Sequence, residues 1–133
     1  MGSKGTVIAG YSTSGGIGTS LLSGPTAIYL DLNRTLYIYD SKNYRVQMWR
    51  FNEPVSTTVA GGFGSGTTLN KISAGYGLYV DDQQRIYVCE YANNRVTRWD
   101  NDTIGVIVSQ IYRREQKNYL LKLYLGERKW HNR

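Results

Sequence analysis

The hydrophobic positions of this chain fall into short runs, separated by stretches rich in glycine, asparagine and aspartate. β-Branched and aromatic residues dominate these runs, which favours strands over helices. The run from Leu36 to Tyr39 is apolar at every position, as expected of a strand in a sheet that is covered on both faces. We predict strands at residues 6–9, 27–31, 36–40, 45–51, 57–60, 78–81, 86–90, 95–99 and 105–108.

The strand pattern repeats at a spacing of fifty residues. Leu36-Tyr37-Ile38-Tyr39-Asp40 recurs as Ile86-Tyr87-Val88-Cys89-Glu90, and Asn43-Tyr44-Arg45-Val46 recurs as Asn93-Asn94-Arg95-Val96. A Gly-rich linker precedes each unit, at residues 10–24 and 61–77. This period is too long for a small-repeat solenoid and fits a four-stranded antiparallel meander, the unit from which propeller blades are built.

The repeated positions resemble the NHL repeat over residues 6–108. The first copy carries Pro25, Ile28, Leu30, Asp31, Leu36, Tyr37, Ile38, Asp40, Asn43, Arg45, Val46 and Trp49, and the second carries Gly77, Leu78, Val80, Asp81, Glu90, Asn93, Arg95 and Trp99. The chain departs from the repeat at Ala27, Gly75 and Glu90, where the family usually has Gly, Pro and Asp. These departures affect only the expected geometry of local turns.

The resemblance implies an all-β fold, a partial β-propeller with two four-stranded antiparallel blades at about residues 25–60 and 75–108. Within a blade, residues 27–31 would be innermost and residues 57–60 outermost, and residues 6–9 would be one orphan outer strand. The propeller fragment would span residues 1–108. Residues 109–133 would form an irregular or helical C-terminal tail outside the repeat.

Two blades are too few to close a propeller ring. We therefore expect open blade faces and self-association through them, because large exposed apolar patches mark interaction surfaces. Tyr29, Tyr37 and Tyr39 are predicted to lie on one outward face, with their repeat equivalents on the other.

Each unit also has a carboxylate that ends one strand, an asparagine three residues later and an arginine that opens the next strand. The carboxylate can accept hydrogen bonds from the turn, and a partly buried arginine needs such a partner. The asparagine tolerates the left-handed conformation that a tight turn requires. We predict a structural network rather than a ligand site, made of Asp40, Asn43, Arg45, Glu90, Asn93 and Arg95.

The positive charge belongs to the tail. Residues 1–108 contain nine lysines and arginines against eight acidic residues, whereas residues 109–133 contain seven against two. The basic residues Arg113, Arg114, Lys117 and Lys122 alternate with apolar residues at helix-like spacing. One interpretation is a basic amphipathic helix for a membrane or nucleic acid, and the other is a frameshifted or mis-spliced end that covers an exposed blade face.

Few residues could support catalysis or bind a metal. Cys89 is the only cysteine and His131 the only histidine, so a multi-ligand metal site lacks its usual donors. Asp81 and Asp82 are adjacent, and neighbouring side chains of a strand point to opposite faces. We expect no catalytic residue, no metal, no cofactor and no enzyme activity. No apolar run is long enough for a membrane helix and residues 1–10 lack a signal-peptide core, which leaves the cytoplasm as the default location.

A binding function is what remains. By resemblance, NHL propellers are mostly protein-interaction scaffolds and some bind RNA. Partners of propellers contact the loops at the blade ends, where Tyr11, Phe63 and Tyr76 would be exposed aromatic residues. We expect a non-catalytic module that binds a protein through these loops, since the near-neutral charge of residues 1–108 disfavours RNA. The alternative is a truncated or frameshifted propeller fragment with no independent activity.

Overall fold

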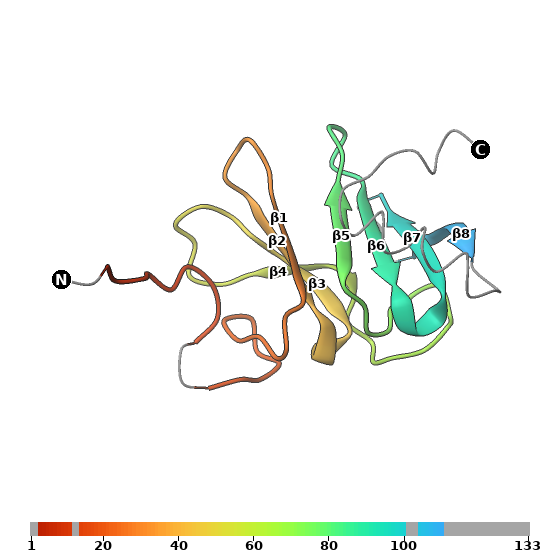
Figure 1. Ribbon diagram of the computed structural model, residues 1–133, viewed down its shortest axis with the longest axis horizontal. Helices are drawn as coiled ribbons and strands as arrows, with labels where there is room; N and C mark the ends of the chain where they lie inside the picture. The colour runs from red at the N-terminus through yellow and green to blue at the C-terminus, as the bar shows by residue number, and fades with distance from the viewer. Residues whose placement is uncertain (1–2, 12–13, 101–103, 111–133) are drawn as a thin grey trace.

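The protein folds into two four-stranded antiparallel sheets joined by a single linker (Figure 1). The computed structural model describes residues 3–11, 14–100 and 104–110. The first sheet contains β1 (Ala27–Leu30), β2 (Leu36–Asp40), β3 (Arg45–Trp49) and β4 (Thr57–Gly61), and the second contains β5 (Gly77–Val80), β6 (Ile86–Glu90), β7 (Arg95–Trp99) and β8 (Val106–Gln110). Short 3-10 helices, η1 (Ser41–Asn43) and η2 (Tyr91–Asn93), join the two middle strands of each sheet. The predicted all-β class is confirmed.

The sequence repeat is a structural repeat that includes its irregularities. Strands β2 and β3 pair over their whole length, and β6 pairs with β7 in the same register fifty residues later. The pairing of the outermost strand shifts register between Val46 and Gln47 in the first sheet and between Val96 and Thr97 in the second. Each outer strand therefore bends away from its neighbour at the same place.

In the middle turn of each sheet, which joins β2 to β3 or β6 to β7, the residue with a left-handed backbone conformation is one position later than predicted. Tyr44 (φ 54°, ψ 48°) and Asn94 (φ 54°, ψ 42°) adopt this conformation, and the expectation that Asn43 and Asn93 would do so is wrong. The reversal is needed immediately before the next strand begins, so it falls on the residue after the 3-10 helix. This position leaves the asparagine side chains available for other contacts.

The two sheets pack face to face, with tyrosines of the first against aliphatic side chains of the second. Tyr37 and Tyr39 are buried in one cluster with Val80, Ile86 and Val88. Burying each such side chain contributes roughly 1.5–3 kcal/mol. This contact between sheets is therefore the main core of the described residues.

This packing contradicts the prediction that Tyr29, Tyr37 and Tyr39 lie on an outward face. Tyr37 and Tyr39 are 2% and 0% exposed, and the ring of Tyr29 meets that of Tyr79 edge-on, with centroids 5.3 Å apart. Both faces of each sheet are apolar, so the strand pattern could not indicate which face would meet the other sheet.

Residues 6–9 do not form the predicted orphan strand. A strand is stabilised by hydrogen bonds to a neighbour, and among the described residues no other strand pairs with this segment. Strand β8 extends to Gln110, two residues past the predicted end of the repeat. The predicted basic tail residues Arg113, Arg114, Lys117 and Lys122 lie outside the described residues, as does His131.

The antiparallel order gives the molecule two unlike ends. We call the lower end in Figure 1 the loop end: it holds the middle turns and the linkers, residues 10–11, 14–24 and 62–75. We call the opposite end the turn end: it holds residues 31–35, 50–56 and 81–85. Candidate binding residues can now be assigned to one end or the other.

Candidate binding surface at the loop end

A buried ion pair ties the linker of the first sheet to its strands. The Arg45 Nε donates to Asp40 Oδ2 at 2.8 Å, and the arginine and aspartate side chains are 6% and 0% exposed. The Asn43 amide donates to the same carboxylate oxygen at 2.8 Å and to the carbonyl of Gly16. The other Asp40 oxygen accepts the backbone N–H of Ser23 at 2.7 Å. Asp40 is thus the centre of the network.

The guanidinium of Arg45 reaches three backbone carbonyls of the linker. Its Nη1 donates to Ile17 at 2.7 Å, and its Nη2 donates to Gly18 and Leu21 at 3.1 Å each. Each of the three guanidinium nitrogens therefore has at least one partner, as a buried arginine requires. The network therefore ties residues 16–18, 21 and 23 of this linker to the strands.

The second sheet repeats this network around Glu90. Arg95 Nε donates to Glu90 Oε1 at 3.1 Å, and Asn93 donates to the same oxygen at 2.9 Å. Arg95 also holds its linker, through the carbonyls of Thr67 and Lys71. All six residues predicted for a structural network therefore lie in two matched clusters that connect strands to linkers.

The two networks differ at one position that sequence reasoning missed. Thr97 donates from Oγ1 to Glu90 Oε2 at 2.6 Å and accepts the indole N–H of Trp99 at 3.1 Å. Its equivalent in the first sheet, Gln47, instead bonds Ser56 and Thr58 of the outer strand region. The sequence contains a signal for this difference, because the second repeat has the longer Glu90 in place of Asp40 and the shorter Thr97 in place of Gln47.

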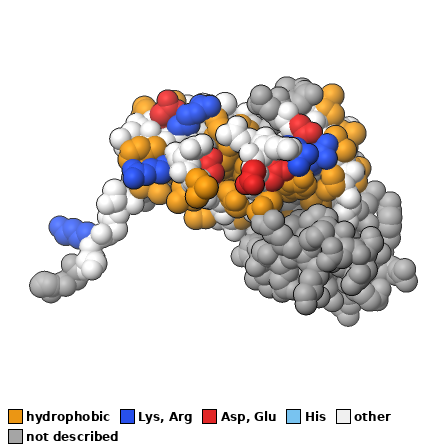
Figure 2. Space-filling model, turned by 90° about the horizontal axis from the view of Figure 1, so that it is seen from above, with side chains coloured by type: hydrophobic (Ala, Val, Ile, Leu, Met, Phe, Trp, Pro, Cys, Tyr) orange, Lys and Arg blue, Asp and Glu red, His pale blue; other side chains and the backbone are white. Residues whose placement is uncertain are grey.

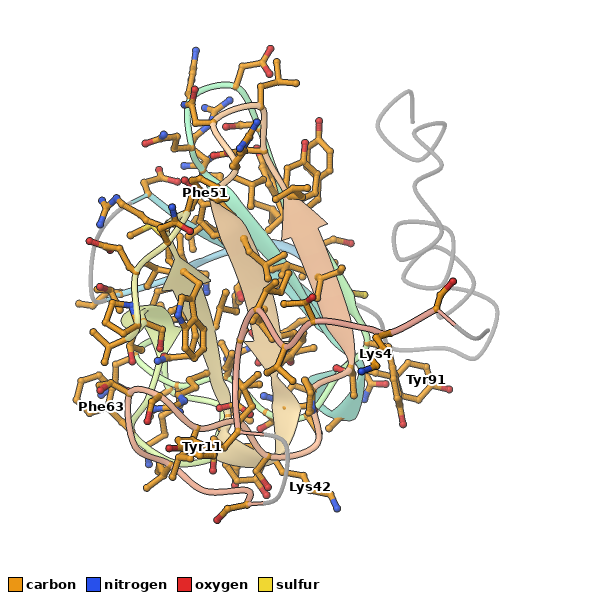
Figure 3. The ribbon with its side chains drawn as sticks, turned by 90° about the vertical axis from the view of Figure 1, so that its left-hand side faces the viewer. Lys4, Tyr11, Lys42, Phe51, Phe63 and Tyr91 are labelled. Atoms are coloured by element: carbon orange, nitrogen blue, oxygen red, sulfur yellow. The ribbon has the colours of Figure 1, made fainter. Side chains whose placement is uncertain are left out.

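Exposed aromatic side chains lie on the linkers and turns of the loop end. Tyr11, Phe63 and Tyr76, the predicted contact residues, are 67%, 57% and 54% exposed. Tyr91, which sequence reasoning missed, is 43% exposed and meets Tyr76 edge-on with ring centroids 5.9 Å apart. Figure 3 shows Tyr11, Phe63 and Tyr91 toward the lower end and Phe51 toward the upper one. Tyr91 replaces Ser41 of the first repeat, so the repeat comparison carried no sign of an aromatic position.

The turn end has a different character. Seen from above, acidic and basic side chains alternate over both sheets (Figure 2). Arg85 pairs with Asp81 at 2.7 Å, and Arg98 pairs with Asp100 at 2.8 Å. Because positive and negative side chains are mixed, this end has no electrostatic field of a single sign. A nucleic-acid backbone is bound by clustered positive charge, which this end does not offer.

An open groove separates the sheets at the turn end. Its volume is about 760 Å³, and its lining includes Tyr37, Met48, Arg50, Arg85 and Asp100. No group of three or more His, Cys, Asp or Glu side chains that could hold a metal ion occurs within the described residues. Asp81 uses its carboxylate on the backbone N–H groups of Gln83 and Arg85 and on the Arg85 side chain, which is a turn-stabilising arrangement.

Cys89 lies on β6, facing away from the first sheet. It clusters with Val96 and the half-buried Tyr87, and burial, assisted by the neighbouring Glu90, raises the pKa of its thiol to about 12. Because the thiolate is the reactive form, this cysteine is unsuited to act as a nucleophile.

Comparison with known protein families and with curated proteins finds no match for this chain. In the part of the chain that the structure describes, no helix is long and apolar enough to cross a membrane.

Proposed function

We propose that this chain is a non-catalytic protein-binding module of the NHL-propeller type, which binds its partner through the loop end. The observation that carries this proposal is the exposure of Tyr11 and Phe63 on linkers that buried arginines hold in place. Ordered aromatic side chains lose little conformational entropy on binding and supply large contact areas. The two repeats would thus present one such contact on each linker.

The chemistry of the surface favours a protein partner over RNA. The described loop-end residues combine exposed aromatic rings with only two linker or turn lysines, Lys42 and Lys71. A phosphate backbone would need a cluster of such charges. A peptide with apolar side chains would instead bury the rings and leave the lysines at the rim.

A random peptide library displayed on phage and panned against the full chain tests this proposal. Enriched peptides should bind the Tyr11→Ser/Phe63→Ser variant at least about tenfold more weakly, as expected when aromatic anchors are removed. The matched control is Phe51→Ser, an equally exposed ring at the turn end. Failure to enrich any peptide, or equal binding to the loop-end variant, would favour the alternative of a fragment without independent activity.

A further inference from the structure

We propose that the segment after β8, residues 111–133, covers the outward face of the second sheet, with Leu121 packed on Cys89 and Val96. The outward face is the one that does not meet the first sheet. This proposal concerns how the chain closes its last sheet, whereas the proposed partner site uses exposed rings on the linkers. Either can fail without the other.

The outward face of the second sheet is covered within a single chain. Cys89 on β6 and Val96 on β7 lie opposite each other, and each is only 3% exposed. Among the described residues, the apolar cluster that they form gains only the half-buried Tyr87, two residues before Cys89 on the same strand. Side chains on one face of a sheet stand side by side, so they cannot shield one another from above. Another segment must therefore lie over them.

The preceding linker and the first sheet both lie on the other face. Neighbouring side chains of a strand point to opposite faces, so Glu90 is on the inward face while Cys89 is on the outward one. Glu90 accepts the N–H of Ser73 in the preceding linker and pairs with Arg95, and the first sheet packs on this same face. The longest segment outside the described residues, 111–133, begins where β8 ends on the second sheet. It is therefore the segment within reach of the outward face.

The two linkers show how the chain returns after an outer strand. A Cβ atom added at Gly10 would lie 3.2 Å from the Leu22 side chain, and one added at Gly61 would lie 2.8 Å from the Ile72 side chain. In both repeats, an apolar residue eleven or twelve positions later therefore comes back beside this point of the chain. The return is a property of the repeat and not of one linker.

The returning residue fills the site that the proposal assigns to Leu121. Ile72 is 0% exposed and belongs to the same buried cluster as Tyr39 and Val46. These two residues occupy, in the first sheet, the positions that the cysteine and valine of the outward cluster occupy in the second. A third returning segment would therefore place its apolar residue on that outward cluster.

The register of the outer strands identifies this residue. Gly61 ends β4 and Gln110 ends β8, and each pairs with the buried arginine of its own sheet. Ile72 follows Gly61 by eleven residues, and the residue eleven positions after Gln110 is Leu121. The segment therefore has a leucine at the position where the linker has its buried isoleucine.

The same alignment separates Leu121 from the leucines that follow it. Leu123 and Leu125 correspond to Ala74 and Tyr76, and both of these linker residues are exposed. We therefore expect substitutions at residues 123 and 125 to leave the cover in place.

A basic amphipathic helix would give a different pattern. Leu120, Leu123 and Tyr124 recur at helical spacing and would share its apolar side, whereas Leu121 would lie away from that side. A helix packed on the sheet through its apolar side would thus depend on residue 123 and not on residue 121. The two leucines therefore distinguish a returning linker from a helix.

Alkylation of Cys89 in the full chain tests the proposal, because this thiol lies beneath the proposed cover and is the only one in the chain. Leu121→Asp places a charge on the covered face and should raise the rate of iodoacetamide alkylation at least about tenfold. Leu121→Ala removes part of the cover without adding a charge and should raise the rate in the same direction by a smaller factor. Leu123→Asp is the matched control and should react like the wild-type chain.

A second measurement separates local uncovering from unfolding of the whole chain. Urea denaturation gives the free energy of unfolding of each variant, and the alkylation rate of Leu121→Asp should rise by more than its increased unfolded population explains. If Leu121→Asp does not fold, the Leu121→Ala variant is compared with Leu123→Ala in the same way.

Two results would overturn the proposal. Unchanged alkylation in both residue-121 variants would show that another part of the chain covers Cys89. Faster alkylation in the residue-123 variant than in the residue-121 variant would show that the segment packs as a helix and not as a returning linker.

Discussion

The hydroxyl of Tyr39, in the first sheet, donates a hydrogen bond to the backbone carbonyl of Ser73, in the linker that leads to the second sheet. The amide of the same Ser73 donates to the Glu90 carboxylate at 3.3 Å, which also pairs with Arg95. The contact between sheets and the buried ion pair of the second sheet are therefore joined through one residue. Loss of the Tyr39 hydroxyl or of the Glu90–Arg95 pair should therefore leave the linker at Ser73 less firmly held.

Replacing Tyr39 with Phe removes the hydroxyl and leaves the Ser73 carbonyl without this donor in a buried site. We expect a loss of about 1–3 kcal/mol in the free energy of unfolding, measured by urea denaturation at a fixed protein concentration. Tyr11→Phe, at an exposed ring, should change the stability by less than about 0.5 kcal/mol. Equal effects from the two substitutions would contradict the role of the hydroxyl.

Removing the arginine of the buried pair should be far more damaging than removing an exposed one. Arg95→Met leaves Glu90 buried and unpaired, and we expect a loss of about 3–5 kcal/mol. Arg98→Met breaks the more exposed pair with Asp100 and should have a much smaller effect on stability, because solvent screens an exposed pair. Thermal unfolding of both variants compares them directly, and a mild effect of Arg95→Met would show that the pair does not hold the linker.

Gly75 should not tolerate a side chain. A Cβ atom there collides with the carbonyl oxygen of Cys89 and crowds Tyr39, so Gly75→Ala should destabilise the protein by about 1–3 kcal/mol. Gly75→Pro should be worse, because the N–H that Ser41 accepts is also lost. Gly5→Ala, where no atom lies within 4 Å of the added carbon, is the control and should be nearly neutral.

The Cys89 thiol should react slowly in the folded protein. With its pKa raised from 9.0 to about 12, the thiolate fraction near neutral pH falls about a thousandfold. The rate of iodoacetamide alkylation should be at least about 100-fold below that of an exposed cysteine, such as Ser65→Cys in a Cys89→Ser background. The Cys89 rate should also keep rising about tenfold per pH unit past pH 9, where the exposed thiol levels off near its ordinary pKa. A plateau at the same pH for both would refute the burial of this thiol.

The strands and the two ionic networks could be predicted from the sequence because they depend on residues close together along the chain. Asp40 and Arg45 face each other across a tight turn, so their spacing of five residues already brings them within reach. The different partners of Gln47 and Thr97 were not predicted, because the tertiary structure decides which partner each side chain reaches: Thr97 bonds Glu90, whereas Gln47 bonds Ser56 and Thr58.

The sequence by itself determined two equivalent four-stranded units. Runs of β-branched and aromatic residues divided by turn residues form strands, and each strand can pair with the next one along the chain. Only the tertiary structure decided which face of each unit would be covered. Strands that are apolar on both sides carry no preference of their own, and the relative rotation of the sheets placed Tyr37 and Tyr39 inside and Ile28 and Leu30 outside. The tertiary structure also decided that residues 6–9 form no strand, because a strand exists only where a neighbour can accept and donate its backbone hydrogen bonds.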